Sequence, residues 1–383
     1  MNALRVRGGA VLTAYGIGKE PLARALRENT KLRTQTLADS SIVDKAKFPG
    51  LLAYDVPDFT PEATLGDKGL RTLDRLTKLL VVTARYALAD AGLKDGGTFV
   101  GVQPEDIGIC TSNAYGSLEA IHEIDRVATL EDPRYINPAK FPNTVSNTAS
   151  GYVSIWEDLR AFNVTVSNGN PGGLDAFYVA AVHASQHRAR HVLVGGGEAL
   201  SDALCVAWHR LGLGTKEPNV APLAEACAYI ALEQIAASEA KIAKGVFVTG
   251  HGAAFDPKAT SSLLVASSDA MERATRFAIA DAGLSPQDID LVITGACGIE
   301  EYDRAQREGV RAVTYAPNFD LKHIAGECLG GAGSLAAWVA AAALAGEVSL
   351  PVSAGGLANT LRTVLITELG FNGNASAIVL VRR

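Results

Sequence analysis

The segment at 167–173, which reads SNGNPGG, has the setting in which many enzymes present a nucleophile. It follows a short β-branched run at 162–167 and precedes a segment over 174–188 whose apolar spacing predicts a helix. A strand–turn–helix elbow places its central residue at a helix N-terminus. That residue is Asn170, and an amide is not a usable nucleophile. Asn is a good N-cap and Pro171 suits the first helical position, so by itself the elbow predicts a helix start without chemistry.

A second candidate is the histidine series His183, His187 and His191, spaced by four residues. Histidines at i and i+4 on one helix face are able to bind a metal, but no carboxylate or Cys completes the set, and His191 begins a predicted strand. The alternative is a basic helix end, with His187, Arg188 and Arg190 facing the negative end of the helix dipole. We favour the helix end and predict neither a metal nor a cofactor.

Two glycine-rich stretches resemble phosphate-binding loops only in part. GGGE at 195–198 follows the strand predicted at 191–194 but lacks the third Gly of a dinucleotide loop. GECLGGAG at 326–333 precedes a helix predicted from Ser334, without the Lys-Ser/Thr pair of a P-loop. We interpret the first as a tight turn where two backbones approach closely.

The composition excludes several classes of protein. The 383 residues carry a net charge of −6, which argues against nucleic acid or an anionic membrane as the main partner. The five Cys are scattered without a CxxC pair, which favours a reducing compartment and no disulfide framework. No signal peptide is evident, and the longest apolar run, 335–344, is too short to span a bilayer and predicts a buried Ala-rich helix. We therefore expect a cytoplasmic protein.

An internal repeat organises the chain. RYALADAGL at 85–93 recurs as RFAIADAGL at 276–284, and each copy is followed by a similar turn and strand, PEDIGI from Pro104 and PQDIDL from Pro286. Two similar blocks in the same order predict a duplication rather than a chance match.

The duplication predicts two pseudo-symmetric halves, 1–235 and 240–383, packed as one unit. Strands alternate with helices in both, up to a last strand at 376–381, and such βαβ units predict a parallel, largely buried sheet.

The chain resembles the β-ketoacyl synthases of the thiolase-like superfamily over nearly its whole length. The matching segments are INPAKFPNTVSNTASGYVSI at 136–155 (an interface segment), the elbow, GGEA at 196–199, EACAYIALE at 225–233, Lys322 of a KSxxGH motif and GFNGNASAIVL at 370–380. This resemblance implies an α/β thiolase-like fold, with duplicated βαβ halves in an αβαβα layered sandwich.

The family's catalytic set is one Cys and two His, and the resemblance places other residues at all three positions: Asn170, Gly295 and Glu327. Asn170 offers no thiolate to accept an acyl chain. Gly295 has no side chain to donate to an enolate oxygen, and an ionised Glu327 would repel its charge. Lys322 is retained. The resemblance therefore implies no intact catalytic set.

Loss of the catalytic groups within a matching frame resembles the chain-length factors of type II polyketide and polyene systems, which are silent subunits in β-ketoacyl synthase complexes. It implies a heterodimer with an active ketosynthase and an acyl carrier protein as further partner, with a reduced polyene favoured over an aromatic product. The residues it assigns to an acyl tunnel or interface are Tyr115, Lys140, Phe141 and Phe371. Ordinary packing is the alternative for each, and Lys140 is expected to snorkel or to pair with an acid across the interface.

Two other functions stay open. One is a thiolase-fold enzyme in which Glu327 and Lys322 form an acid/base pair, for example in acyl thioester hydrolysis or cyclisation. The other is a homodimeric scaffold that binds an acyl carrier, for which an acidic chain is poorly suited.

Overall fold

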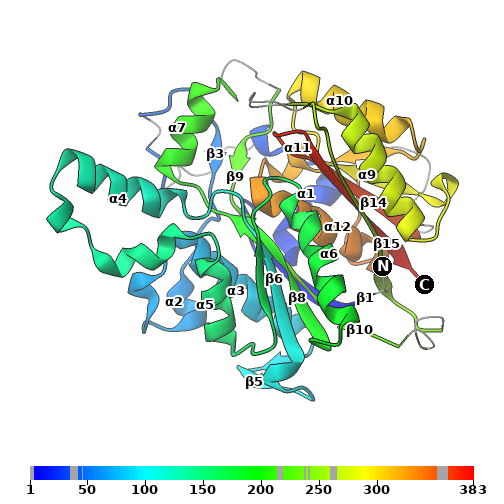
Figure 1. The fold of residues 1–383 in the computed structure, drawn as a ribbon, viewed down its shortest axis with the longest axis horizontal. Coiled ribbons are helices and arrows are strands. Elements are labelled where there is room, and N and C mark those ends of the chain that lie inside the picture. The colour runs from blue at the N-terminus through cyan, green and yellow to red at the C-terminus, as the bar shows by residue number, and fades with distance from the viewer. Residues whose placement is uncertain are drawn as a thin grey trace.

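The computed structural model describes residues 4–34, 42–44, 46–213, 219–236, 239, 242–258, 265–351 and 361–383. One eleven-stranded sheet runs through the molecule, with helices on its faces (Figure 1). Its strands are β1 (Leu4–Thr13), β2 (Gly16–Ile17), β6 (Ile107–Ser112), β7 (Asn163–Val166), β8 (His191–Glu198), β10 (Ala226–Gln234), β11 (Val246–Phe255), β12 (Leu291–Thr294), β13 (Asn318–Asp320), β14 (Thr363–Leu369) and β15 (Asn374–Arg382). Two small pairs join β3 (Ala53–Tyr54) to β9 (Leu223–Ala224) and β4 (Lys94–Asp95) to β5 (Thr98–Phe99).

The helices pack in layers against the faces of the sheet. They are α1 (Lys19–Glu28), α2 (Pro61–Leu65), α3 (Arg75–Asp90), α4 (Leu118–Leu130), α5 (Thr148–Glu157), α6 (Gly172–Ser185), α7 (Asp202–Arg210), α9 (Ser268–Asp281), α10 (Glu300–Arg311), α11 (Lys322–Ala325) and α12 (Ala332–Ala345). The 3₁₀ turns are η1 (Leu32–Thr34), η2 (Leu70–Thr72), η3 (Pro104–Asp106), η4 (Pro133–Tyr135), η5 (Pro138–Thr144), η6 (Pro286–Asp288) and η7 (Leu329–Gly331). Helices α6 and α12 pack against each other and against strands of both halves, whereas α3 and α9 pack on β1 and β11 respectively. Of these helices, none is long and apolar enough to cross a membrane.

Alternate side chains of a buried strand pack into different layers of the molecule. In β10, Ala228 and Ile230 pack into the core that contains α6 and α12, while Tyr229 and Ala231 pack into the core that contains α3. Because successive side chains of a strand point to opposite faces, the sheet is covered on both sides here. This arrangement confirms the αβαβα sandwich, and α12 is the buried Ala-rich helix that its composition predicted.

Strand order shows the duplication directly. From one edge to the middle the order is β7–β6–β8–β10–β1, and from the other edge it is β13–β12–β14–β15–β11. Numbered along each half, both orders read 3-2-4-5-1. The halves join where β1 pairs with β11, through Leu4 with Val248 and Arg5 with Phe247.

The repeated ADAG motif has the same structural role in both halves. Both first strands carry a bulge, between Val6 and Gly8 in β1 and between Val248 and Gly250 in β11. A β-carbon at Gly8 would lie 2.7 Å from the backbone N of Ala91, and one at Gly250 would lie 2.2 Å from the carbonyl oxygen of Ala278. The aspartate of each motif then accepts a hydrogen bond from the bulged strand, Asp90 from the Gly9 N–H and Asp281 from the His251 N–H. The repeat therefore joins the end of a helix to a bulged strand.

The prediction of a parallel sheet was wrong in the middle of the sheet. Strand β6 pairs parallel with β7 and β8, and β12 with β13 and β14, but the pairings that involve β1, β10, β11 and β15 are antiparallel. The short turn between β14 and β15 makes a hairpin, which a reading based on βαβ units missed.

Two local predictions also need correction. Helix α6 ends at Ser185, so His187 lies outside it, with a positive φ of 55°. The GGG run is not a turn, because β8 continues to Glu198. The predicted close approach is present, since a β-carbon at Gly196 would lie 2.2 Å from the Ser112 carbonyl oxygen.

Candidate functional site

Asn170 lies in the turn between β7 and α6, where it is 1% exposed. Its prediction as an N-cap was wrong: Pro171 is the capping residue, and neither Oδ1 nor Nδ2 of Asn170 has a hydrogen-bond partner among the described residues. An unsatisfied buried amide costs free energy, typically about 1–3 kcal/mol. The elbow is formed, but its central side chain contributes neither a nucleophile nor a cap.

The start of α6 lies against the start of α12. A β-carbon at Gly173 would lie 2.6 Å from the backbone N of Ser334, so the two helix N-termini meet without side chains between them. The hydroxyl of Ser112 donates to the carbonyl of Gly330, which fixes β6 to the loop before α12. The elbow is therefore next to the segment that carries Glu327, one of the other two replaced positions.

Lys322 is held between two buried carboxylates. Its Nζ lies 3.1 Å from Glu327 Oε2 and 3.0 Å from Glu368 Oε2, and all three residues are at most 3% exposed. The other oxygen of Glu327 accepts a hydrogen bond from the Leu329 N–H at 2.8 Å. We call Lys322, Glu327 and Glu368 the buried ion trio.

The trio holds one cation and two carboxyl groups. The pKa values of Lys322 and Glu368 reflect this excess of carboxyl groups. Burial acts to lower the pKa of Lys322, but the charges of Glu327 and Glu368 outweigh it and raise that pKa. Burial raises the pKa of Glu368 to about 7, although Lys322 acts to lower it. Lys322 therefore stays charged, and Glu368 gains or loses its proton near neutral pH.

We expect stability to fall as the pH rises through this range. The folded-state pKa of Glu368 lies above the ordinary 4.5, so its contribution is fully present below pH 4.5 and is lost as the pH rises to about 7. The loss is on the order of 3 kcal/mol. Urea unfolding at pH 5 and pH 8 measures it, and Glu368→Gln should reduce the pH dependence without abolishing it, because burial also raises the pKa of Glu198 to about 7. An unchanged slope in that variant would show that Glu368 is not the titrating group.

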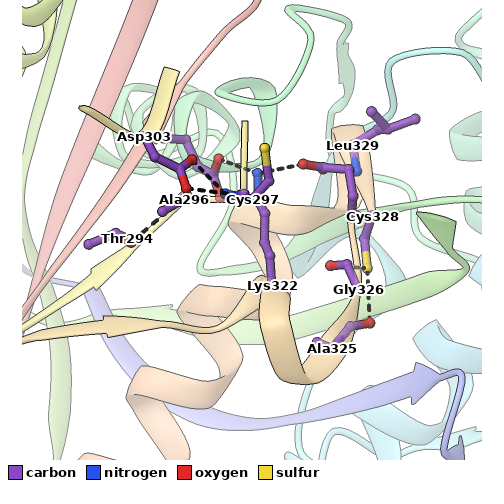
Figure 2. Close-up of polar contacts among 12 residues, drawn as sticks. Thr294, Ala296, Cys297, Asp303, Lys322, Ala325, Gly326, Cys328 and Leu329 are labelled. Atoms are coloured by element: carbon purple, nitrogen blue, oxygen red, sulfur yellow. Dashed lines mark hydrogen bonds and ion pairs between the residues drawn. The ribbon is translucent and has the colours of Figure 1, made fainter. Parts of the chain in front are cut away.

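The loop that contains Gly295 is fixed by Asp303 of α10. Its two carboxylate oxygens accept hydrogen bonds from the Cys297 and Gly298 N–H groups, each at 2.9 Å, and Figure 2 shows Asp303 beside Cys297 with Lys322 reaching toward the same loop. Burial raises the pKa of the Cys297 thiol above its usual range, so this cysteine stays protonated. The loop is therefore held by α10 and presents no reactive sulfur.

One small cavity adjoins the trio among the described residues. A cavity of about 10 Å³ is lined by residues of β12, α11, the following loop, α12 and β14 (Thr294, Leu321, Lys322, Ala325, Gly326, Cys328, Ala332, Leu335, Ala336 and Glu368). One water molecule needs at least about 10–15 Å³. The cavity therefore has no room for an acyl thioester.

A second buried carboxylate, Glu198 at the end of β8, lies in a ring of backbone donors. It accepts hydrogen bonds from the N–H groups of Ala114 and Tyr115, at 2.8 and 3.1 Å, and from the backbone of Gly330. Burial raises the pKa of Glu198 to about 7, although these donors act to lower it. Glu198 thereby ties the loop after β6 to the loop before α12.

The residues predicted for a tunnel or interface lie in two places. Tyr115 and Phe371 are near the trio. Burial and the charges of Glu198 and Glu327 raise the pKa of Tyr115, and the Phe371 ring lies 5.4 Å from the ring of buried Tyr302. Lys140 and Phe141 lie on η5. Lys140 pairs with Glu123 of its own chain at 2.6 Å, and Phe141 is 65% exposed.

Sequence reasoning found part of this site. Lys322 and Glu327 do come together, and Gly295 lies against Glu368, a residue that the motifs did not indicate. The available signal was an acid inside the apolar run TVLITEL, since a charge in a buried strand needs a partner. The histidine series has another role, since His183 stacks on Phe162 at 4.3 Å. Among the described residues, no group of three or more His, Cys, Asp or Glu is arranged to hold a metal.

Both halves of the chain match models of known protein families. Residues 4–226 match the model described as beta-ketoacyl synthase, N-terminal domain, and residues 246–354 match the corresponding C-terminal domain. The chain belongs to the β-ketoacyl synthase family. The resemblance in the motifs is thereby confirmed.

Individual proteins agree with the family assignment. The tetracenomycin polyketide synthase ketoacyl synthase beta subunit of Streptomyces glaucescens is 25% identical over 73% of this chain and 71% of its own length. The ishigamide ketosynthase/chain length factor structure has a TM-score of 0.78 at 24% identity and covers 100% of this chain and 99% of its own. A type II acyl-carrier protein complex with its ketosynthase has a TM-score of 0.78 at 17% identity and covers 100% of both chains. At these identities the two structures show the thiolase-like fold.

Proposed function

We propose that this chain is a non-catalytic chain-length factor, which pairs with an active ketosynthase and helps to set the length of an acyl chain carried by an acyl carrier protein. The observation that carries the proposal is the buried ion trio, which includes Glu327 and lies against Gly295, the two positions that the resemblance assigns to the family's histidines. Its place would be in type II synthesis of a polyketide, with a reduced polyene preferred.

The chemistry of condensation supports this proposal. An acyl chain is transferred to a thiolate, and Asn170 has no group that forms such an ester. Decarboxylation of the extender unit develops negative charge on an enolate oxygen, which needs donors. Gly295 offers no side chain, and the Glu327 carboxylate would repel that charge. Both steps therefore lack the side chains that the family uses for them, at all three positions.

The enclosed trio also weakens the alternative of an acid/base enzyme. A catalytic acid or base must come within hydrogen-bond reach of its substrate. Glu327 is 0% exposed, its carboxylate is already bound by Lys322 and the Leu329 N–H, and the adjoining cavity is about 10 Å³. These contacts favour a structural role for the trio.

A broad face of the N-terminal half is suited to a protein partner. Helix α4 projects from the body of the molecule (Figure 1). Large apolar side chains are exposed along α4, η4, η5, α5 and α6. They are Ile121, Leu130, Tyr135, Phe141, Val145, Ile155 and Tyr178. Strand β7 lies beside them at the edge of the sheet, with a free edge within the described strands. Contiguous exposed apolar surface is typical of a binding face. We call this face the α4–α6 face.

The same face is the proposed contact with the ketosynthase. A relative of known structure is described as a ketosynthase/chain length factor, which supports a partner of this kind. Another is described as an acyl-carrier protein with its ketosynthase, which supports the carrier as the third component. The chain itself is acidic, so we expect the ketosynthase to supply the basic surface that an acidic carrier needs.

Co-expression with the cognate ketosynthase tests this proposal, and we expect the two chains to purify together in equal amounts. Ile155→Arg should abolish co-purification without changing the stability of the free chain, because Ile155 is 72% exposed and a buried unpaired cation is costly. Ile242→Arg is the matched control, since Ile242 is 83% exposed and lies outside the α4–α6 face. A stable homodimer of this chain that does not bind the ketosynthase would contradict the proposal.

A further inference from the structure

The absence of a side chain at Gly295 is explained by one neighbour. A β-carbon on Gly295 would lie 2.2 Å from Oε2, 2.7 Å from Cδ and 3.1 Å from Oε1 of Glu368, and these are its three nearest atoms. Gly295 is not among the glycines of positive φ, so its backbone conformation accepts an L-residue. The Glu368 carboxylate, rather than the backbone, therefore excludes a side chain at position 295.

Glu368 has little freedom to move aside. It is 1% exposed on β14, and its Oε2 accepts a hydrogen bond from Lys322 Nζ at 3.0 Å. Lys322 is fixed in turn by Glu327 at 3.1 Å. The adjoining cavity is about 10 Å³, which is too small for a displaced carboxylate. Any rotation of Glu368 would break its ion pair with Lys322 inside the protein.

We propose that Glu368 occupies the place that a side chain at position 295 requires, and that it thereby helps to keep this site inactive. The inference rests on the proposed function for the assignment of position 295 to the family's first histidine. Its consequence is specific. Cysteine at 170 with histidines at 295 and 327 does not rebuild a catalytic set while Glu368 remains, because an imidazole at 295 and this carboxylate compete for the same volume.

A double-mutant cycle tests the steric claim independently of any activity. Gly295→Ala alone should lower the folded-to-unfolded equilibrium constant by about tenfold, since overpacking a filled core is destabilising. The same substitution in a Glu368→Ala background should cost much less, because the methyl group then enters vacated space. Glu368→Ser replaces Glu368→Ala if the alanine variant does not fold.

Two controls separate volume from charge. Glu368→Gln keeps the shape of the side chain and should not relieve Gly295→Ala, and neither should Glu327→Gln, which removes the other carboxylate of the trio. A β-carbon on Gly151 of α5 would have nothing within 4 Å, so Gly151→Ala should have the same effect in the wild-type and Glu368→Ala backgrounds.

An equal effect of Gly295→Ala in the wild-type and Glu368→Ala backgrounds would overturn the inference. The outcome is independent of whether the chain pairs with a ketosynthase, so failure of one proposal is distinguishable from failure of the other.

Discussion

Replacing Lys322 with methionine is expected to lower the free energy of unfolding by about 3–5 kcal/mol, the usual cost of removing one partner from a buried ion pair. The substitution keeps most of the apolar volume but leaves Glu327 and Glu368 facing one another without a cation. Burial then disfavours both charges, and at least one carboxyl must take up a proton. Urea unfolding at pH 7 measures the change.

Matched variants identify the cause of this loss. Glu368→Gln leaves one cation with one carboxylate, so we expect it to be nearly neutral. Lys322→Met combined with Glu327→Gln and Glu368→Gln removes every charge of the trio and should recover most of the stability, because neutral replacements of a buried ionic group are often tolerated. If Lys322→Met alone is neutral, the trio does not hold this site together.

Tyr115→Ala is expected to have the largest effect on the product. The resemblance assigns Tyr115 to an acyl tunnel or interface, and we propose that its ring lines the tunnel. Its backbone N–H donates to Glu198, so the loop should keep its course when the ring is removed. A truncated side chain leaves space where the growing chain otherwise stops. With the cognate ketosynthase and carrier, we expect longer products, which mass spectrometry of the carrier-bound chains detects.

A second tyrosine provides the control for this experiment. Tyr315 is 79% exposed and stacks under Arg311 in the C-terminal half, away from the trio. Tyr315→Ala should therefore leave product length unchanged. Unchanged products with Tyr115→Ala, in a pair that still assembles, would remove Tyr115 from the tunnel.

The duplicated fold was predictable from the sequence because the repeat includes contact residues. The aspartate in each ADAG copy binds a bulged strand, so the motif carries information about tertiary structure. The buried helix α12 was predictable because its residues are small and apolar on every side. These features are local or repeated, and therefore visible along one chain.

The site was only partly predictable because its partners are distant in sequence. Lys322 and Glu327 are five residues apart and were recognised together, whereas Glu368 comes from strand β14, which is more than 40 residues further along the chain. The N-cap prediction for Asn170 failed because the helix begins after Pro171, at the tight contact between Gly173 and Ser334. Neither the pairing of Lys322 with Glu368 nor that contact is specified by local propensity.

The most direct test of the central claim is condensation by the reconstituted pair, measured with the carrier protein and its extender unit. We predict that this chain alone forms no product, that the pair forms product of defined length, and that Asn170→Ala in this chain leaves the rate unchanged. Replacing the nucleophilic cysteine of the partner ketosynthase should abolish all condensation. Product formed by this chain alone, or by the pair after loss of that cysteine, would contradict the account.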